Sequence, residues 1–297
     1  MTTDTERIPA WVAPFRALLR TQSVPRFGSD ELSILSDYSG TGGSHCYKVY
    51  SFLLFSRSQS PDWPQLRHDL RTRFPDRRRI SYKALSPSSH LQSQLHPFLS
   101  IADTLTGWCV TIAVHNSFKR LVTDDESCLA IWQTIAKLEG GWKPAQFENV
   151  LRIVHFLGLL LAEIIGNSVQ IEWISDQDDI FANDARCSDV TRVLRLCLGS
   201  YAPNAIGHVI VGTSEIDTGH LGIEDLLAIP DLAAGAVADF TTARDKKADL
   251  PDKAITIAKW LRHSSGPLSK CSIEFRPDTN GQMSLAPLES QLMSIGR

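Results

Sequence analysis

The chain lacks the short motifs that identify several enzyme classes. It contains no G-x-x-x-x-G-K-[ST], no G-x-S-x-G and no H-E-x-x-H, so a P-loop, an α/β-hydrolase nucleophile elbow and a zincin helix are not expected. Its glycine cluster, Gly40, Gly42 and Gly43, does not follow G-x-G-x-x-G and opens no predicted helix. A dinucleotide-binding loop is therefore not predicted.

Cysteine is sparse and scattered. The six cysteines include no C-x-x-C pair, which argues against a disulfide scaffold and a zinc ribbon. The first residues, MTTDTER, contain acids and no apolar stretch, so no secretory signal is visible. The most apolar stretch, residues 150–165, is interrupted by Arg152, His155 and Glu163 and is shorter than a membrane span. We expect a soluble cytoplasmic protein with reduced thiols and no membrane partner.

The chain also lacks a strong charge of either sign. Its 33 acidic and 30 basic residues give a net charge of −3, which excludes a bulk polycation and a solvating acidic tail. With 43% hydrophobic residues in 297, it can bury a sizeable core, so disorder is not expected. A local basic surface remains compatible with this balance.

The order of secondary-structure signals predicts an α/β fold. Apolar and β-branched patterns predict strands at residues 32–36, 47–55, 79–85, 108–114, 169–174 and 208–211. Capping signals and helical spacing predict helices at residues 11–19, 96–104, 123–140, 144–165, 188–198, 224–242 and 252–262. Pro230 is expected to break or restart the helix that contains it. CSIEF and QMSL, joined by PDTNG, predict a terminal hairpin.

Taken together, these signals predict a mixed sheet flanked by helices. Its first three strands are expected to be antiparallel, and strands then alternate with helices. Residues 1–30 are interpreted as an N-terminal segment. Residues 31–297 are interpreted as a single domain that ends in a helix and a hairpin.

Aspartates at the ends of predicted elements are the main candidates for chemistry. Asp37 ends the first strand, Asp176 follows the strand VQIEWI with Asp178 and Asp179 behind it, and Asp231 lies in the apolar stretch LLAIPDLAAGAVADF. A carboxylate in an apolar setting must be paired, bound to metal or exposed. Carboxylate oxygens are the ligands that Mg²⁺ and Mn²⁺ prefer, and two such ions can promote phosphodiester hydrolysis.

Each acid also has a purely structural interpretation. Asp37 can start a turn, residues 176–179 can form a solvated loop or cap a helix, and Asp231 can be an ordinary charge in the first turn of a helix. The three acids together are stronger evidence for a metal site than any one of them alone.

Two of these stretches carry a resemblance to a known family. ILSDYSGTG resembles the D-x-S-G opening of the DUF3800 family, and LLAIPDLAAGAVADF is similar to that family's helix with apolar-Asp-Leu-x-Ala-Gly-Ala. VQIEWISD matches the intervening strand and aspartate more loosely. The resemblance spans about residues 31 to 245. It implies a ribonuclease H-like fold and a metal-dependent nuclease site. Asp37 would then be the first-strand acid, Asp176 the later strand acid and Asp231 the helix acid.

A basic segment, RHDLRTRFPDRRR, lies beside the predicted third strand. Such a patch can hold phosphates. Alternatively, the segment is a solvated connector with local ion pairs to Asp69 and Asp76. The candidate nucleic-acid-binding residues are Arg71, Arg73, Arg77, Arg78, Arg79 and Lys83.

These observations favour a cytoplasmic metal-dependent hydrolase. We expect a nuclease that cleaves phosphodiester bonds in DNA or RNA with Mg²⁺ or Mn²⁺ held by Asp37, Asp176 and Asp231. Asp178 or Asp179 could replace one of these ligands. The alternative is a non-catalytic module of the same fold that binds nucleic acid or a protein partner. Convergence of the three aspartates would favour the enzyme.

Overall fold

The computed structural model describes most of the chain. The described residues are 8–22, 24–25, 27, 31–40, 44–74, 78–85, 89–122, 128–166, 169–176, 179–203, 206–217, 219–263, 265–288 and 291.

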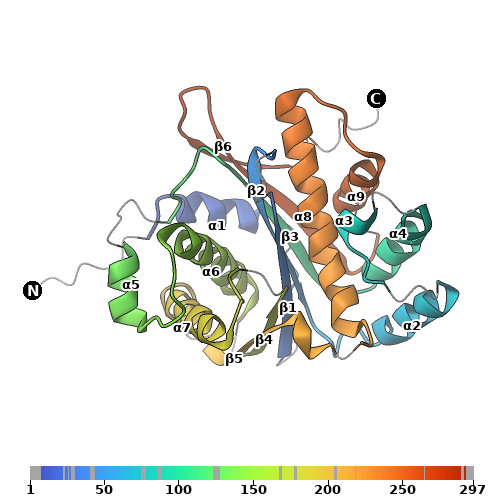
Figure 1. The fold of residues 1–297 in the computed structure, drawn as a ribbon, viewed down its shortest axis with the longest axis horizontal. Coiled ribbons are helices and arrows are strands. Elements are labelled where there is room, and N and C mark those ends of the chain that lie inside the picture. Colours follow the sequence, from blue (N-terminus) through green and yellow to red (C-terminus); the bar gives the residue numbers. More distant parts are fainter. Residues whose placement is uncertain are drawn as a thin grey trace, which may run out of the picture.

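One seven-stranded sheet forms the centre of the molecule (Figure 1). Its strands are β1 (Glu31–Ser39), β2 (Tyr47–Phe55), β3 (Gly107–His115), β4 (Val169–Ser175), β5 (Ile206–Thr213), β6 (Leu268–Pro277) and β7 (Met283–Pro287). Their order is β5-β4-β1-β2-β3-β6-β7. β1, β2 and β3 are antiparallel neighbours, β4 and β5 run parallel to β1, and β6 runs parallel to β3. This confirms a mixed sheet. Its antiparallel trio is β1, β2 and β3, whereas the prediction had residues 79–85 as the third strand.

Helices cover both faces of the sheet (Figure 1). The helices are α1 (Val12–Arg20), α2 (Trp63–Arg73), α3 (Tyr82–Leu85), α4 (Ser89–Ala102), α5 (Cys128–Ala136), α6 (Pro144–Ile164), α7 (Asp184–Tyr201), the 3₁₀ turn η1 (Ser214–Ile216), α8 (Gly222–Lys246) and α9 (Asp252–Arg262). α1, α5, α6 and α7 lie on one side, and α2, α3, α4, α8 and α9 on the other. The molecule is thus a three-layer α/β fold.

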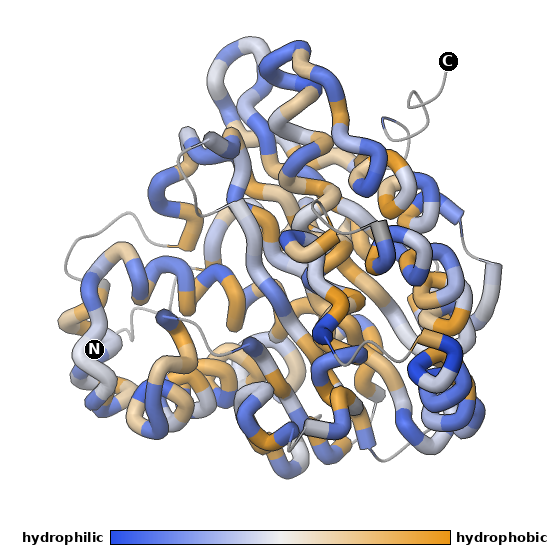
Figure 2. Tube along the Cα trace, turned by 45° about the vertical axis from the view of Figure 1, so that its right-hand side comes forward, coloured by the Kyte–Doolittle hydropathy of each residue, from blue (hydrophilic) through white to orange (hydrophobic). Residues whose placement is uncertain are grey.

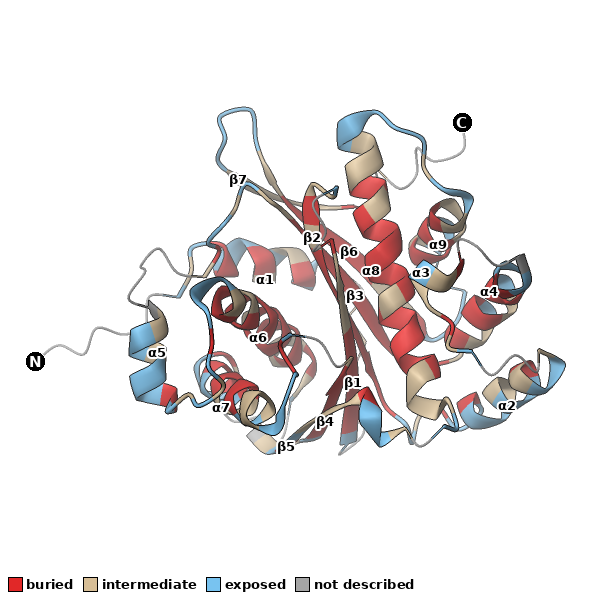
Figure 3. Ribbon diagram, in the orientation of Figure 1, coloured by how far each residue is buried: buried red, intermediate tan, exposed pale blue. Residues whose placement is uncertain are grey.

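Two apolar cores lie between the sheet and the helices, one on each face of the sheet. Alternate residues of β2 divide between them: Tyr50 and Phe52 join the core under α6, whereas Val49 and Leu53 join the core under α8. Apolar residues concentrate along the strands and on the inner faces of the helices (Figure 2). Figure 3 shows α6, α8 and the central strands as the buried centre of the fold.

The N-terminal helix belongs to the α6 core. Phe15 and Leu19 of α1 are fully buried, and Arg16 and Arg20 both contact the Glu163 carboxylate of α6. Its apolar face supplies the burial that a nine-residue helix needs for stability.

Helix α8 is continuous, contrary to the expected break at Pro230. Pro230 lies inside the helix and is itself buried. Packing of α8 along β1 and β2 offsets the backbone hydrogen bond that proline cannot make. Of the described helices, α8 alone has the length and composition of a membrane span, and 78% of that window is buried, which is typical of a core helix.

The predicted third strand at residues 79–85 is wrong. The end of this stretch forms the short helix α3, and the sheet's third strand is β3. Ile80 is fully buried in the α8 core, and Tyr82 packs on α8. The alternation of Ile80, Tyr82 and Ala84 therefore reflects packing of this segment on α8. A pattern of three residues is too short to distinguish such a segment from a strand.

Candidate functional site

Strand register brings two of the predicted acids together. β1 and β4 are parallel, and Ser36 pairs with Ser175, so Asp37 lies beside Asp176, the residue after β4. Asp37 does not end its strand as predicted, because β1 continues to Ser39. Leu35 and Ile174, two residues earlier in each strand, both lie in the core under α8. Because strand side chains alternate between faces, Asp37 and Asp176 project toward α8.

Asp231 reaches the same end of the sheet from α8. Its Oδ2 accepts a hydrogen bond from the backbone N–H of Tyr82 at 2.7 Å. Burial raises the pKa of Asp231, and the negative charge of Asp176 raises it further, while the Tyr82 N–H, Arg79 and Lys253 oppose the rise. Asp231 is thus close enough to Asp176 for their charges to interact.

The guanidinium of Arg79 lies among these carboxylates. Its Nη1 is 2.7 Å from Asp176 Oδ2, and its Nε is 2.9 Å from Glu224 Oε2 without hydrogen-bond alignment. Asp176 also accepts a hydrogen bond from the Ser214 hydroxyl at 2.9 Å. Burial raises the pKa of Glu224, as does the charge of Asp176, whereas Arg79 lowers it. The chain therefore supplies its own cation at this cluster, which we call the Arg79 cluster: Arg79, Asp176, Glu224 and Asp231, with Asp37 placed beside Asp176 by strand register.

The position of Arg79 depends on a clamp around Tyr82. A Cβ at Gly235 would lie 2.2 Å from Tyr82 Cγ, so only glycine lets this ring rest on α8. The Tyr82 hydroxyl donates to Asp239 at 2.6 Å, and the Lys253 ammonium lies 3.9 Å from the ring centroid. The glycine and acids of the D-L-A-A-G-A-V-A-D stretch thus hold the segment that carries Arg79.

The donor chemistry of the cluster suits a divalent cation. Its carboxylates come from near the ends of two strands and from α8. The guanidinium of Arg79 lies between these carboxylates and neutralises them, as a bound metal ion would. Within the described ranges, however, no three His, Cys, Asp or Glu residues are arranged to hold a metal ion as they stand. Asp178 lies outside the described residues.

Two of the six candidate residues of the predicted basic patch, Arg71 and Arg79, form ion pairs inside the fold. On α2, Arg67 and Arg71 both contact the buried Asp225 carboxylate, so the Arg71 side chain is only 14% exposed. Arg79 belongs to the carboxylate cluster. Arg73, Arg78 and Lys83 are exposed, and Arg77 lies outside the described residues. The partners of Arg71 and Arg79 lie on distant segments and not among the local acids.

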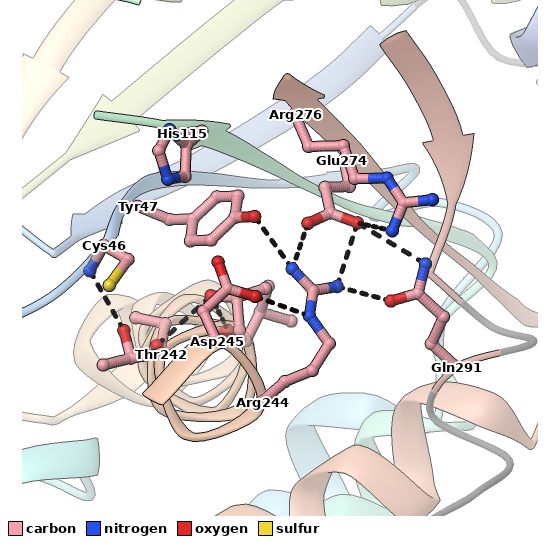
Figure 4. Close-up of polar contacts among 12 residues, drawn as sticks. Cys46, Tyr47, His115, Thr242, Arg244, Asp245, Glu274, Arg276 and Gln291 are labelled. Carbon is pink, nitrogen blue, oxygen red and sulfur yellow. Dashed lines mark hydrogen bonds and ion pairs between the residues drawn. The ribbon is translucent and has the colours of Figure 1, made fainter. Parts of the chain in front are cut away.

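A separate polar network fixes the far end of α8 (Figure 4). Arg244 contacts both carboxylate oxygens of the fully buried Glu274 on β6, and donates to the Tyr47 hydroxyl at 2.8 Å and to Asp245 at 2.8 Å. Burial, with Glu274 nearby, strongly raises the pKa of Tyr47. Because its central charges are paired, we interpret this network as structural.

Sequence reasoning missed Glu224 and the roles of Arg79 and Tyr82. Glu224 has the signal of an acid in the first turn of a helix, seven residues before Asp231. Nothing local indicates that Arg79 turns toward Asp176, since the two are far apart in sequence and their contact depends on the Tyr82 clamp.

Comparison with known proteins adds no assignment. A scan of protein-family models finds no match to the chain, and a search of the curated proteins finds no relative. The resemblance to the DUF3800 family therefore stays a prediction based on two sequence motifs.

Proposed function

We propose that the chain is a metal-dependent phosphodiesterase acting on nucleic acid, with a ribonuclease H-like core. The complete strand order differs from the ribonuclease H order 3-2-1-4-5, because β6 and β7 extend the sheet. Without those two strands, the neighbours β3-β2-β1-β4-β5 have that order, with α6 and α7 on one face and α8 on the other. This arrangement supports the proposal.

The observation that carries the proposal is the pairing of Ser36 with Ser175. It places Asp37 beside Asp176 at the carboxyl ends of adjacent parallel strands, where ligands commonly bind in α/β sheets. Asp231 adds a third carboxylate with a raised pKa. Carboxylates crowded in this way favour a bound cation.

Asp37, Asp176 and Asp231 would hold Mg²⁺ or Mn²⁺. When bound, such ions activate a water and stabilise the leaving oxygen of a phosphodiester. The chain's own groups orient the site: Ser214 fixes the Asp176 carboxylate, and the Tyr82 N–H fixes that of Asp231. The exposed Arg73, Arg78 and Lys83 lie on segments next to the cluster and would contact the phosphate backbone.

The second candidate is a non-catalytic module that binds nucleic acid. Two observations favour it. Arg79 forms an ion pair with Asp176, and in the described part of the chain no three His, Cys, Asp or Glu residues are arranged to hold a metal ion. In that case Arg79 is the permanent counter-ion of the acids.

A cleavage assay separates the two. End-labelled single- and double-stranded DNA and RNA are incubated with the protein in Mg²⁺, Mn²⁺ or EDTA, and binding is measured in parallel. The proposed enzyme cleaves with metal only, and Asp37→Asn or Asp231→Asn abolishes cleavage. Asp249→Asn, at an exposed site beyond α8, serves as the matched control. Binding without cleavage supports the module, and cleavage that survives both variants overturns the assignment.

A further inference from the structure

A cavity of about 590 Å³ lies on the α6 face of the sheet. It is bounded by the start of β2, the segment after β3 and the first turns of α6. Lys48 of β2 projects into this face, because its neighbours Tyr47 and Val49 belong to the opposite core. The cavity is therefore separated by the sheet from Asp37 and α8, and its volume is typical of small-molecule sites.

The lining of the cavity is strongly basic. Lys48, Lys119, Arg120 and Arg152 line it, and Glu148 is the acid among the described lining residues. The side-chain ammonium groups of Lys48 and Lys119 have no hydrogen bond or ion pair to the described part of the chain. Burial lowers the pKa of Lys48, and the positive charges of Arg152 and Lys119 lower it further. A bound anion would relieve this repulsion.

The Glu148 carboxylate supplies an acceptor at the same place. Glu148 is 8% exposed, and its Oε1 accepts from the Leu121 N–H at 2.6 Å and from Arg152 Nε at 2.9 Å. Its Oε2 is buried without a hydrogen-bond partner in the described structure. This oxygen has almost no accessible surface, so a ligand N–H reaches it only if the Glu148 side chain turns toward the cavity. Such a hydrogen bond would remove the cost of a buried unpaired carboxylate oxygen.

Further groups suit an aromatic ligand. Tyr50 donates its hydroxyl hydrogen to Asn149 Oδ1 at 2.6 Å, so the Asn149 side-chain NH₂ is oriented away from that contact. Phe118, Leu129 and Pro144 add apolar wall. The cavity thus combines cations for a phosphate, an acceptor for an amino group and apolar surface for a ring.

We propose that this cavity binds a nucleoside 5′-monophosphate, either free or at the end of a strand. Lys48 and Lys119 bind the phosphate, and Glu148 Oε2 accepts an N–H from the base. The inference does not depend on the proposed phosphodiesterase activity, because the two sites lie on opposite faces of the sheet.

Calorimetric titration of the full chain at low salt tests the site. The probes are GMP, AMP, CMP, a 5′-phosphorylated trinucleotide, guanosine and inorganic phosphate. We expect a mononucleotide or the trinucleotide to bind more tightly than guanosine or phosphate alone, and the affinity to fall as salt rises. Lys48→Met, which keeps the apolar stem, should weaken nucleotide binding about tenfold, the loss expected for one charge-assisted hydrogen bond.

Two variants serve as controls. Lys259→Ala removes an exposed lysine on α9, and Asp37→Asn changes the opposite face; both should leave nucleotide affinity unchanged. Lys119→Ala, at an exposed position that should fold normally, is expected to weaken binding several-fold. The proposal is overturned if no phosphorylated probe binds, if phosphate binds as tightly as every nucleotide, or if neither lysine variant weakens binding. A loss of cleavage in Asp37→Asn with intact nucleotide binding separates this site from the phosphodiesterase site.

Discussion

The Arg79 guanidinium lies 2.7 Å from the Asp176 carboxylate, so an internal cation neutralises the acid that the sequence assigns to a metal. Arg79→Gln removes that cation and leaves Asp176, Glu224 and Asp231 to repel one another. We expect the free energy of unfolding at pH 7 to fall by about 1–2 kcal/mol, because the pair is only partly buried.

The same Arg79→Gln variant should respond more strongly to a divalent ion. In thermal unfolding, Mn²⁺ is expected to raise the Tm of this variant more than that of the wild type, because the ion no longer competes with a guanidinium. Arg79→Lys, which keeps the charge, is the control. An equal Mn²⁺ shift in Arg79→Gln and wild type would contradict competition at this cluster.

The raised pKa of Asp231 predicts a stability difference that depends on pH. An acid whose pKa is higher in the folded than in the unfolded protein holds its proton more tightly when folded, so its ionisation destabilises the fold as pH rises. Asp231→Asn removes this titration and keeps an oxygen that can accept the Tyr82 N–H. The variant should therefore gain stability relative to wild type as the pH rises above about 4, the ordinary pKa of an aspartate.

Urea unfolding at several pH values measures this difference, with Asp249→Asn as an exposed control. If Asp231 is also a metal ligand, the variant loses cleavage while its relative stability at neutral pH rises. A stability difference that does not change with pH would show that the Asp231 carboxylate is not destabilised by folding.

Gly235→Ala tests the Tyr82 clamp. The added Cβ would lie 2.2 Å from Tyr82 Cγ, so the ring and the segment with Arg79 must move. We expect a loss of about 1–3 kcal/mol, the usual cost of overpacking. Gly199→Ala in α7 is the control: its Cβ meets nothing within 4 Å, and it should be neutral or stabilising by up to ~1 kcal/mol. Equal stabilities for the two variants would contradict the clamp.

Arg244→Met tests whether the network in Figure 4 is structural. It leaves Glu274, which is fully buried, without its main counter-ion, and should cost about 3–5 kcal/mol in urea unfolding. Arg276→Met is the control, because Arg276 is 43% exposed and lies 3.9 Å from Glu274, and its loss should cost less than about 1 kcal/mol. The double variant Arg244→Met/Glu274→Met should recover much of the loss.

Sequence patterns predicted the elements that have strong local signals. β2 and α9 have the predicted bounds, and α6 differs by one residue at its end, because aromatic strand residues, Pro144 and the apolar helix face are decided locally. The convergence of Asp37 with Asp176 depends on strand register, which an order of elements alone does not determine. The partners of Arg71 and Arg79 are Asp225 and Asp176, each more than 90 residues away in sequence. Sequence reasoning therefore could not show that these two arginines are paired inside the fold.

The hairpin of β6 and β7 determines which strand lies at one edge of the sheet. Without this hairpin, β3 would be the edge strand of the sheet. The backbone groups along one side of its nine residues would then be unpaired and could pair with another chain. β6 covers that edge. β7 then pairs with residues 273–277 of β6, and this short edge strand has only five residues and ends at Pro287, which has no N–H to donate. The C-terminal hairpin therefore protects this side of the molecule against strand addition and aggregation.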